Sequence, residues 1–232
     1  MLTHAISWED IEIQLKYAAS CDNAKGRHDA VLVLADMLED GGRGEDAAWI
    51  RCHVDSGVEP LQAVRYQHQV RLQMCCDFGR PPRFAVRDGV IVGVTFRECR
   101  LANVGPLVEF PWLEYVDFSS TRLSDDASAF LDSMNLRAFH ADYTQVGAGT
   151  IRRLVRMSRL ESVSLLSTRV SIQAAEALLD LSDRIRHLHY DSWVLPPAIG
   201  ARMEDRFGQR LRAPSAVDAV AYATANGCSI HD

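Results

Sequence analysis

The chain has 232 residues, a formal net charge of -6 and 47% hydrophobic residues. This composition is ordinary for a globular protein and excludes a chain that is disordered throughout. No apolar run approaches the roughly 18 to 20 residues that span a bilayer, and the first ten residues lack the basic start of a secretory signal. We therefore expect a cytoplasmic protein with no membrane partner, and the acidic total argues against nucleic acid.

Residues 1–82 are predicted to form a helical block. Apolar residues recur at helical spacing near residues 8–18, 30–37, 46–54 and 61–75. Ser7 and Asp10 can form a capping box at the start of the first helix. The tract Gly79-Arg80-Pro81-Pro82 then interrupts the chain before the next pattern begins.

A motif in this block resembles the bacterial repeat-companion domain, a small helical region that precedes leucine-rich repeats. The matching positions are Ala35, Asp36, Leu38, Glu39, Ile50 and Arg51. Leu34 and Met37 stand where the family usually has aromatic residues. The resemblance implies an N-terminal cap that seals the open edge of a sheet, and it carries no established activity.

The second half contains an internal repeat. A pattern of apolar residues at positions one, four, six and eleven can be laid on the chain five times, with a small residue at position nine in the first four copies and Trp193 in the degenerate fifth. The first positions are Ile91, Leu113, Leu136, Leu160 and Ile185. Their spacing of 22 to 25 residues lies within the range of about 20–29 that is typical of leucine-rich repeats.

Each repeat predicts one short strand followed by a helix. Positions four to six alternate with period two, which predicts parallel strands centred near Val94, Val116, Phe139, Val163 and Leu188. Position nine is Cys99, Thr121, Thr144 or Thr168, and a threonine hydroxyl can bond the backbone of the turn that leaves the strand. Helical stripes follow near residues 127–134, 151–155, 172–179 and 199–207.

Residues 91–207 therefore resemble a leucine-rich repeat domain of the helical, ribonuclease-inhibitor-like kind. The resemblance implies an α/β fold: a curved solenoid with parallel strands on the concave face and helices outside. We expect a cap at residues 1–82, about five repeats in residues 83–212, and a C-terminal capping helix in residues 213–232.

Motifs for chemistry are scarce. The six cysteines form no Cys-x-x-Cys pair, so even the vicinal Cys75 and Cys76 are best interpreted as small buried hydrophobes. Gly147-Ala148-Gly149 lacks the third glycine of a dinucleotide-binding loop and is interpreted as turn punctuation. We predict no cofactor and no metal.

Strand alternation identifies the side chains expected on the concave face. The predicted binding residues are Tyr115, Asp117, His140, Asp142, Tyr143, His187, His189 and Asp191. Two chemical alternatives use the same residues. The set His187, His189 and Asp191 could hold a metal, and His140 with Asp142 could act as an acid–base pair.

The function expected from this pattern is a non-enzymatic module that binds a protein or peptide partner on its concave face. The alternatives are a metal-dependent or hydrolytic enzyme, and an adaptor or immunity subunit of a bacterial defence or toxin system. The competing surface is an outer helix that carries Arg152, Arg153, Arg156 and Arg159.

Overall fold

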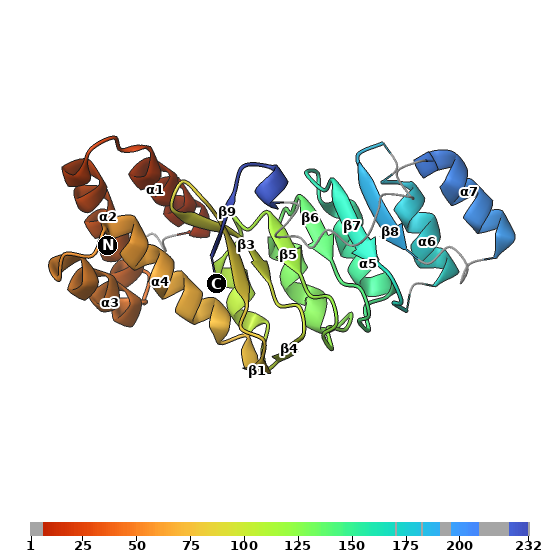
Figure 1. The fold of residues 1–232 in the computed structure, drawn as a ribbon, viewed down its shortest axis with the longest axis horizontal. Coiled ribbons are helices and arrows are strands. Elements are labelled where there is room, and N and C mark those ends of the chain that lie inside the picture. The colour runs from red at the N-terminus through yellow and green to blue at the C-terminus, as the bar shows by residue number, and fades with distance from the viewer. Residues whose placement is uncertain (1–6, 170, 182, 191–195, 209–222, 232) are drawn as a thin grey trace, which may run out of the picture. The chain divides into compact units, whose positions relative to one another are not determined.

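The computed structural model describes residues 7–169, 171–181, 183–190, 196–208 and 223–231. It has a mixed α/β fold with a seven-stranded, mostly parallel sheet. The chain divides into two compact units (Figure 1). The first comprises Met1–Leu72 and Val86–Ile91, and the second comprises Gln73–Ala85 and Val92–Asp232.

The first unit is helical. Its helices are α1 (Trp8–Ser20), α2 (Ala24–Asp40), α3 (Gly44–Asp55) and α4 (Pro60–Gln73). The predicted capping box is present, because the Ser7 hydroxyl accepts from the Asp10 N–H while the Asp10 carboxylate accepts from the Ser7 N–H. Helix α2 packs against α1 and α3.

The residues that resemble the repeat-companion motif join α2 to α3. The Arg51 guanidinium lies 2.6 Å from the carboxylate of Asp36 and 2.6 Å from that of Glu39. The apolar members Ala35, Leu38 and Ile50 are buried in the helical core. The charged residues of the motif therefore form ion pairs between α2 and α3 at the surface, and its apolar residues pack in the core.

The sheet belongs to the second unit except for Val86–Ile91, which are part of the first. Its strands are β2 (Arg83–Arg87), β3 (Val90–Thr95), β5 (Tyr115–Asp117), β6 (Ala138–His140), β7 (Ser162–Leu165), β8 (His187–Tyr190) and β9 (Ser229–His231), in the spatial order β8-β7-β6-β5-β3-β2-β9. The five predicted strands pair in parallel with Val94, Val116, Phe139, Val163 and Leu188 in register. Figure 1 shows them side by side in chain order.

The turns that leave these strands share one conformation. Glu98, Ser120, Tyr143 and Ser167 occupy the same repeat position, and all have a positive φ between 52° and 65°. At the next position the hydroxyls of Thr121, Thr144 and Thr168 donate to the carbonyl three residues earlier, at 2.6 to 2.8 Å. The threonines thus provide the predicted side-chain bond to the turn.

Helices form a layer that connects the parallel strands. They are η1 (Gly105–Glu109), η2 (Ala127–Ser133), α5 (Ala148–Arg156), α6 (Ile172–Leu179) and α7 (Pro197–Phe207), and each packs on the next. The stretch from Ala127 is a short 3₁₀ segment, because an i, i+3 apolar spacing suits that helix as well as the α-helix. The rings of Phe96, Phe118 and Phe139 pack against one another in the core.

Strands β1 (Cys76–Gly79) and β4 (Cys99–Leu101) were not predicted. They form a separate antiparallel pair, β1 before the repeats and β4 at the end of the first one. Helix α4 therefore ends at Gln73 and does not continue to Cys75. Strands β2 and β3 are joined by Asp88 and Gly89, which both have positive φ. That Asp-Gly pair is a strong hairpin signal in the sequence.

The C-terminal segment returns to the start of the sheet. Strand β9 lies beside β2, at the opposite end of the sheet from β8. Ala223 and Cys228 are buried with Tyr115 and Ala138. Part of the expected capping helix in residues 213–232, namely 213–222, lies outside the described residues. The described part does not cap the β8 end of the sheet, because its strand β9 lies beside β2. No helix in the described part of the chain combines the length and apolar character needed to cross a membrane.

Candidate binding surface

Parallel pairing aligns the predicted binding residues in two rows across the sheet. One row contains Tyr115, Ala138, Ser162 and His187, and the next contains Asp117, His140, Ser164 and His189. Paired residues share a face of the sheet, so both rows lie on the face opposite the apolar residues Val116, Phe139 and Val163. We refer to the second set, Asp117 to His189, as the polar row.

The expectation that all these side chains are exposed is wrong for four of them. Tyr115, Asp117, His140 and Asp142 are buried, with exposed fractions of 0% to 5%. Tyr143 is 60% exposed. His187 is exposed and His189 is half-buried, while Asp191 lies outside the described residues.

Tyr115 is buried for a physical reason that the repeat pattern does not contain. Its side chain belongs to a cluster with Ala85, Ala138, Ala223 and Cys228. Two of these residues come from the C-terminal segment, about a hundred positions along the chain. The returning segment therefore covers a part of the sheet face that alternation alone leaves open.

Hydrogen bonds account for the burial of His140 and Asp142. The His140 Nε2 lies 3.0 Å from the Ser162 hydroxyl. The Asp142 Oδ1 accepts from the Ser164 hydroxyl at 2.6 Å and from the Leu166 N–H at 2.8 Å. The serines of β7 are thus the partners that allow the imidazole of β6 and the carboxylate two residues after it to be buried.

Two polar atoms of the polar row have no partner within the described residues. The Asp117 Oδ1 accepts from the Ser119 N–H at 2.8 Å, but its Oδ2 is buried without a hydrogen bond. The Nε2 of His189 is likewise buried and unbonded. A buried polar atom without a partner costs roughly 1–3 kcal/mol, so both atoms favour an additional partner.

The chemical alternatives find limited support in this geometry. The acid–base alternative pairs His140 with Asp142, and both side chains are buried. The His140 Nε2 lies 3.0 Å from the Ser162 hydroxyl, while the Asp142 Oδ1 accepts from Ser164 and Leu166. Among the described side chains, no group of three or more His, Cys, Asp or Glu residues is arranged to hold a metal ion. The predicted metal set includes Asp191, which lies outside that part of the chain.

A charge ladder that the sequence analysis missed runs along the starting ends of the strands. Glu114, Arg137, Glu161 and Arg186 occupy repeat position two, and their charges alternate. Neighbouring members lie 4.0, 2.9 and 3.8 Å apart. Arg186 ends this charge ladder at the outermost described strand, and its side chain is 70% exposed. The alternation at one repeat position was the signal that could have revealed it.

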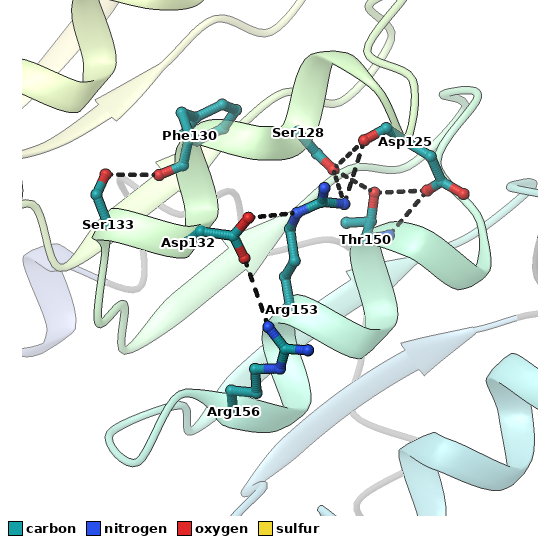
Figure 2. A network of polar contacts seen from close by, with 8 residues as sticks. All are labelled: Asp125, Ser128, Phe130, Asp132, Ser133, Thr150, Arg153 and Arg156. Atoms are coloured by element: carbon teal, nitrogen blue, oxygen red, sulfur yellow. Dashed lines mark hydrogen bonds and ion pairs between the residues drawn. The ribbon is translucent and has the colours of Figure 1, made fainter.

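The arginines of the outer helical surface are mostly paired with their own fold. Arg153 and Arg156 of α5 both contact Asp132, at 3.2 and 3.9 Å (Figure 2). Arg159 lies 3.3 Å from Glu114. Arg152 is exposed. Three of these four arginines therefore form ion pairs with acidic residues of earlier repeats, which partly neutralise the positive charge of this surface.

Comparison with protein-family models, with curated proteins and with solved structures finds no match.

Proposed function

We propose that the second unit is a curved leucine-rich repeat solenoid of the ribonuclease-inhibitor-like kind. The recurring left-handed turn at Glu98, Ser120, Tyr143 and Ser167 supports this proposal, as do the threonine bonds beside it. The ion pairs of Arg51 with Asp36 and Glu39 support the related proposal that the first unit is a repeat-companion domain.

We further propose that the chain is a non-enzymatic module that binds a protein or peptide partner on the strand face. The observation that carries this proposal is the polar row, which keeps a hydrogen-bonding residue on every strand from β5 to β8. At its outer end the buried Nε2 of His189 has no hydrogen-bond partner among the described residues, while His187 on the same strand is exposed. A partner that reaches this end can satisfy the imidazole and cover the neighbouring surface.

The charges of this region favour an acidic partner. Arg186, directly before His187, ends the charge ladder with a cation, so a carboxylate is the group that continues the alternation. Tyr143 lies in the turn after β6 and is 60% exposed. An exposed tyrosine is the kind of anchor that dominates many interfaces. The binding residues of the proposal are therefore Tyr143, Arg186, His187 and His189, and the buried Tyr115, Asp117, His140 and Asp142 support them.

Site-specific crosslinking tests the proposal. Benzoylphenylalanine would replace Tyr143 in one variant and Arg152, on the helical side, in a matched control. After irradiation in an extract of the native host, we expect one defined adduct from position 143 and none from position 152. The captured protein is then titrated against purified variants.

The titration uses exposed residues so that the fold is retained. His187→Ala and Tyr143→Ala should each weaken binding by roughly tenfold, the effect of about 1.4 kcal/mol. Arg152→Glu should bind like the unmodified protein. If only Arg152→Glu loses affinity, or if only position 152 forms an adduct, the assignment to the strand face is wrong.

A further inference from the structure

Two cysteines lie on one face of the small β1–β4 sheet. In this antiparallel pair Cys76 is opposite Leu101, and Gly79 is opposite Cys99. Paired residues share a face, and residues two apart on one strand also share it. The register shifts by one residue between Cys76 and Phe78, which brings Cys76 onto the face of Gly79 and Cys99. Cys76 and Cys99 are therefore diagonal neighbours on the same face.

Gly79 lets the two strands come close together. Its φ is +114°, and a Cβ at this position would lie 3.0 Å from the Glu98 carbonyl oxygen. A side chain would therefore force the strands apart beside Cys99. The Cys99 thiol also donates to the Arg80 carbonyl at 2.8 Å, which fixes the direction of its side chain.

The two thiols contact each other. A side-chain hydrogen bond between them lowers the pKa of Cys99 and raises that of Cys76. Cys99 is therefore the thiol that more readily becomes a thiolate, the nucleophilic form. The adjacent Cys75 differs, because burial, followed by the charge of Glu109, raises the pKa of its thiol to about 12.

Access distinguishes Cys76 from the other two thiols. Cys76 is half-buried, so peroxide can approach the pair beside it, whereas Cys99 and Cys75 are both buried. Cys99 differs from Cys75 in its contact with Cys76. Among the described residues Cys52 is an exposed cysteine in the first unit, and it offers an internal reference for oxidation at the surface.

We propose that Cys76 and Cys99 form a site of reversible oxidation, at which hydrogen peroxide converts the two thiols into a disulfide that links β1 to β4. The Cys99 thiolate attacks one peroxide oxygen and the O–O bond breaks, which gives a sulfenic acid and hydroxide. The hydroxide takes up the proton that the Cys99 thiol released and becomes water. The Cys76 sulfur then attacks the sulfenic sulfur, the S–O bond breaks, and a second water leaves with the Cys76 proton. Two thiols lose two electrons and two protons, and one peroxide is reduced to two waters.

The disulfide would join the ends of a segment that contains the whole β2–β3 hairpin. Cross-linking restricts the unfolded chain more than the folded one, so oxidation should stabilise the second unit. The new bond would also replace the hydrogen bond from Cys99 to the Arg80 carbonyl. The pair thus offers a chemical means of fixing the start of the repeat sheet in response to peroxide.

The test uses the complete reduced chain and hydrogen peroxide. After treatment, free thiols are alkylated and the protein is digested without reduction. We expect a peptide pair linked through Cys76 and Cys99, free Cys75, and reversal by dithiothreitol. The melting temperature of the oxidised protein should exceed that of the reduced protein.

Two variants separate the pair from its neighbour. Cys75→Ser should still form the linked peptides and show the rise in melting temperature, whereas Cys76→Ser should show neither. A link through Cys75, oxidation confined to Cys52, or conversion of Cys99 to a sulfinic acid without a link in the unmodified protein would each overturn the proposal. Because the peptide map is made on the unmodified chain, the result does not depend on how well a variant folds.

Discussion

Asp125 and Thr150 join two successive repeats through a carboxylate at the start of helix α5. The Asp125 Oδ1 accepts from the Thr150 N–H at 2.9 Å and from the Thr150 hydroxyl at 2.7 Å. The same carboxylate accepts from the N–H groups of Gly147 and Gly149 at 2.7 and 2.9 Å. Figure 2 shows the two side chains facing each other, with Ser128 beside them. An aspartate from one repeat therefore caps the helix of the next.

Replacement of Asp125 by alanine should destabilise the second unit by about 2 kcal/mol, because N–H groups at the helix start lose a charged acceptor. Burial works against the charged form of Asp125, but hydrogen bonds from Thr150, Gly147 and Gly149 outweigh it and lower its pKa. The stabilisation is thus present above the ordinary pKa of aspartate and is lost as the pH falls through the lowered value. Urea unfolding at neutral pH measures the effect.

The control for this prediction is the next residue. Asp126 is exposed, and its side chain makes no capping bond to η2. Asp126→Ala should therefore change the free energy of unfolding by less than about 0.5 kcal/mol. Equal losses in the two variants would contradict the capping role of Asp125.

Sequence predicts those parts of this fold that depend on local periodicity. The alternation around Val116, Phe139 and Val163 predicts strands, their parallel pairing and the face that carries the polar row. The capping residue Ser7 was also identified, since a cap depends on a bond to a residue three positions away.

The remaining features depend on contacts between distant segments. Burial of Tyr115 requires Ala223 and Cys228, which no local pattern relates to β5. The contact between Cys76 and Cys99 requires the antiparallel pairing of two strands on either side of a hairpin. Gly149 leaves room for the Asp125 carboxylate of the preceding repeat, 24 residues earlier in the chain. The residues next to Gly149 in the sequence indicated only a turn.

The charge ladder gives a second prediction. Arg137 lies between Glu114 and Glu161, and its side chain is 24% exposed. A double-mutant cycle of Arg137→Met and Glu161→Gln should give a coupling of about 1 kcal/mol, because the pair is partly shielded from solvent and aligned by the strands. Thermal or urea unfolding of the four proteins provides the measurement.

An exposed ion pair in the same unit serves as the reference for this cycle. Arg202 lies 3.4 Å from Glu176, and their side chains are 59% and 48% exposed. The cycle of Arg202→Met and Glu176→Gln should give less than about 0.5 kcal/mol. A coupling at Arg137 no larger than this would show that the ladder adds nothing beyond a surface pair.

His68 gives the first unit a predicted dependence on pH. Burial, together with the nearby Arg43, lowers its pKa to about 3 against the opposing effect of Asp46. The folded protein therefore keeps His68 neutral in a range where the unfolded chain protonates it. Stability should be full above about pH 6.5 and should fall as the pH decreases from there towards 3, by up to about 1.4 kcal/mol per pH unit.

The variant His68→Gln, which cannot take up this proton, should have a flatter profile between pH 7 and pH 5. Hydrogen exchange of the amides in α3 and α4 reports the stability of this unit at each pH. The loss in free energy of unfolding between pH 7 and pH 5 should be smaller in the variant than in the unmodified protein by about 2 kcal/mol. Parallel profiles for the two proteins would assign the acid sensitivity to other groups.

The repeated turn supplies the final prediction. Ser120 is exposed and has a φ of 60°, which is a left-handed conformation. A β-branched side chain is strongly disfavoured there, whereas glycine adopts it without strain. Ser120→Val should therefore cost about 1–2 kcal/mol, and Ser120→Gly should stay within roughly 0.5 kcal/mol of the original, since relief of strain offsets the greater freedom of the unfolded chain. Urea unfolding decides the outcome: if valine and glycine are tolerated equally, the turn does not hold Ser120 in this conformation.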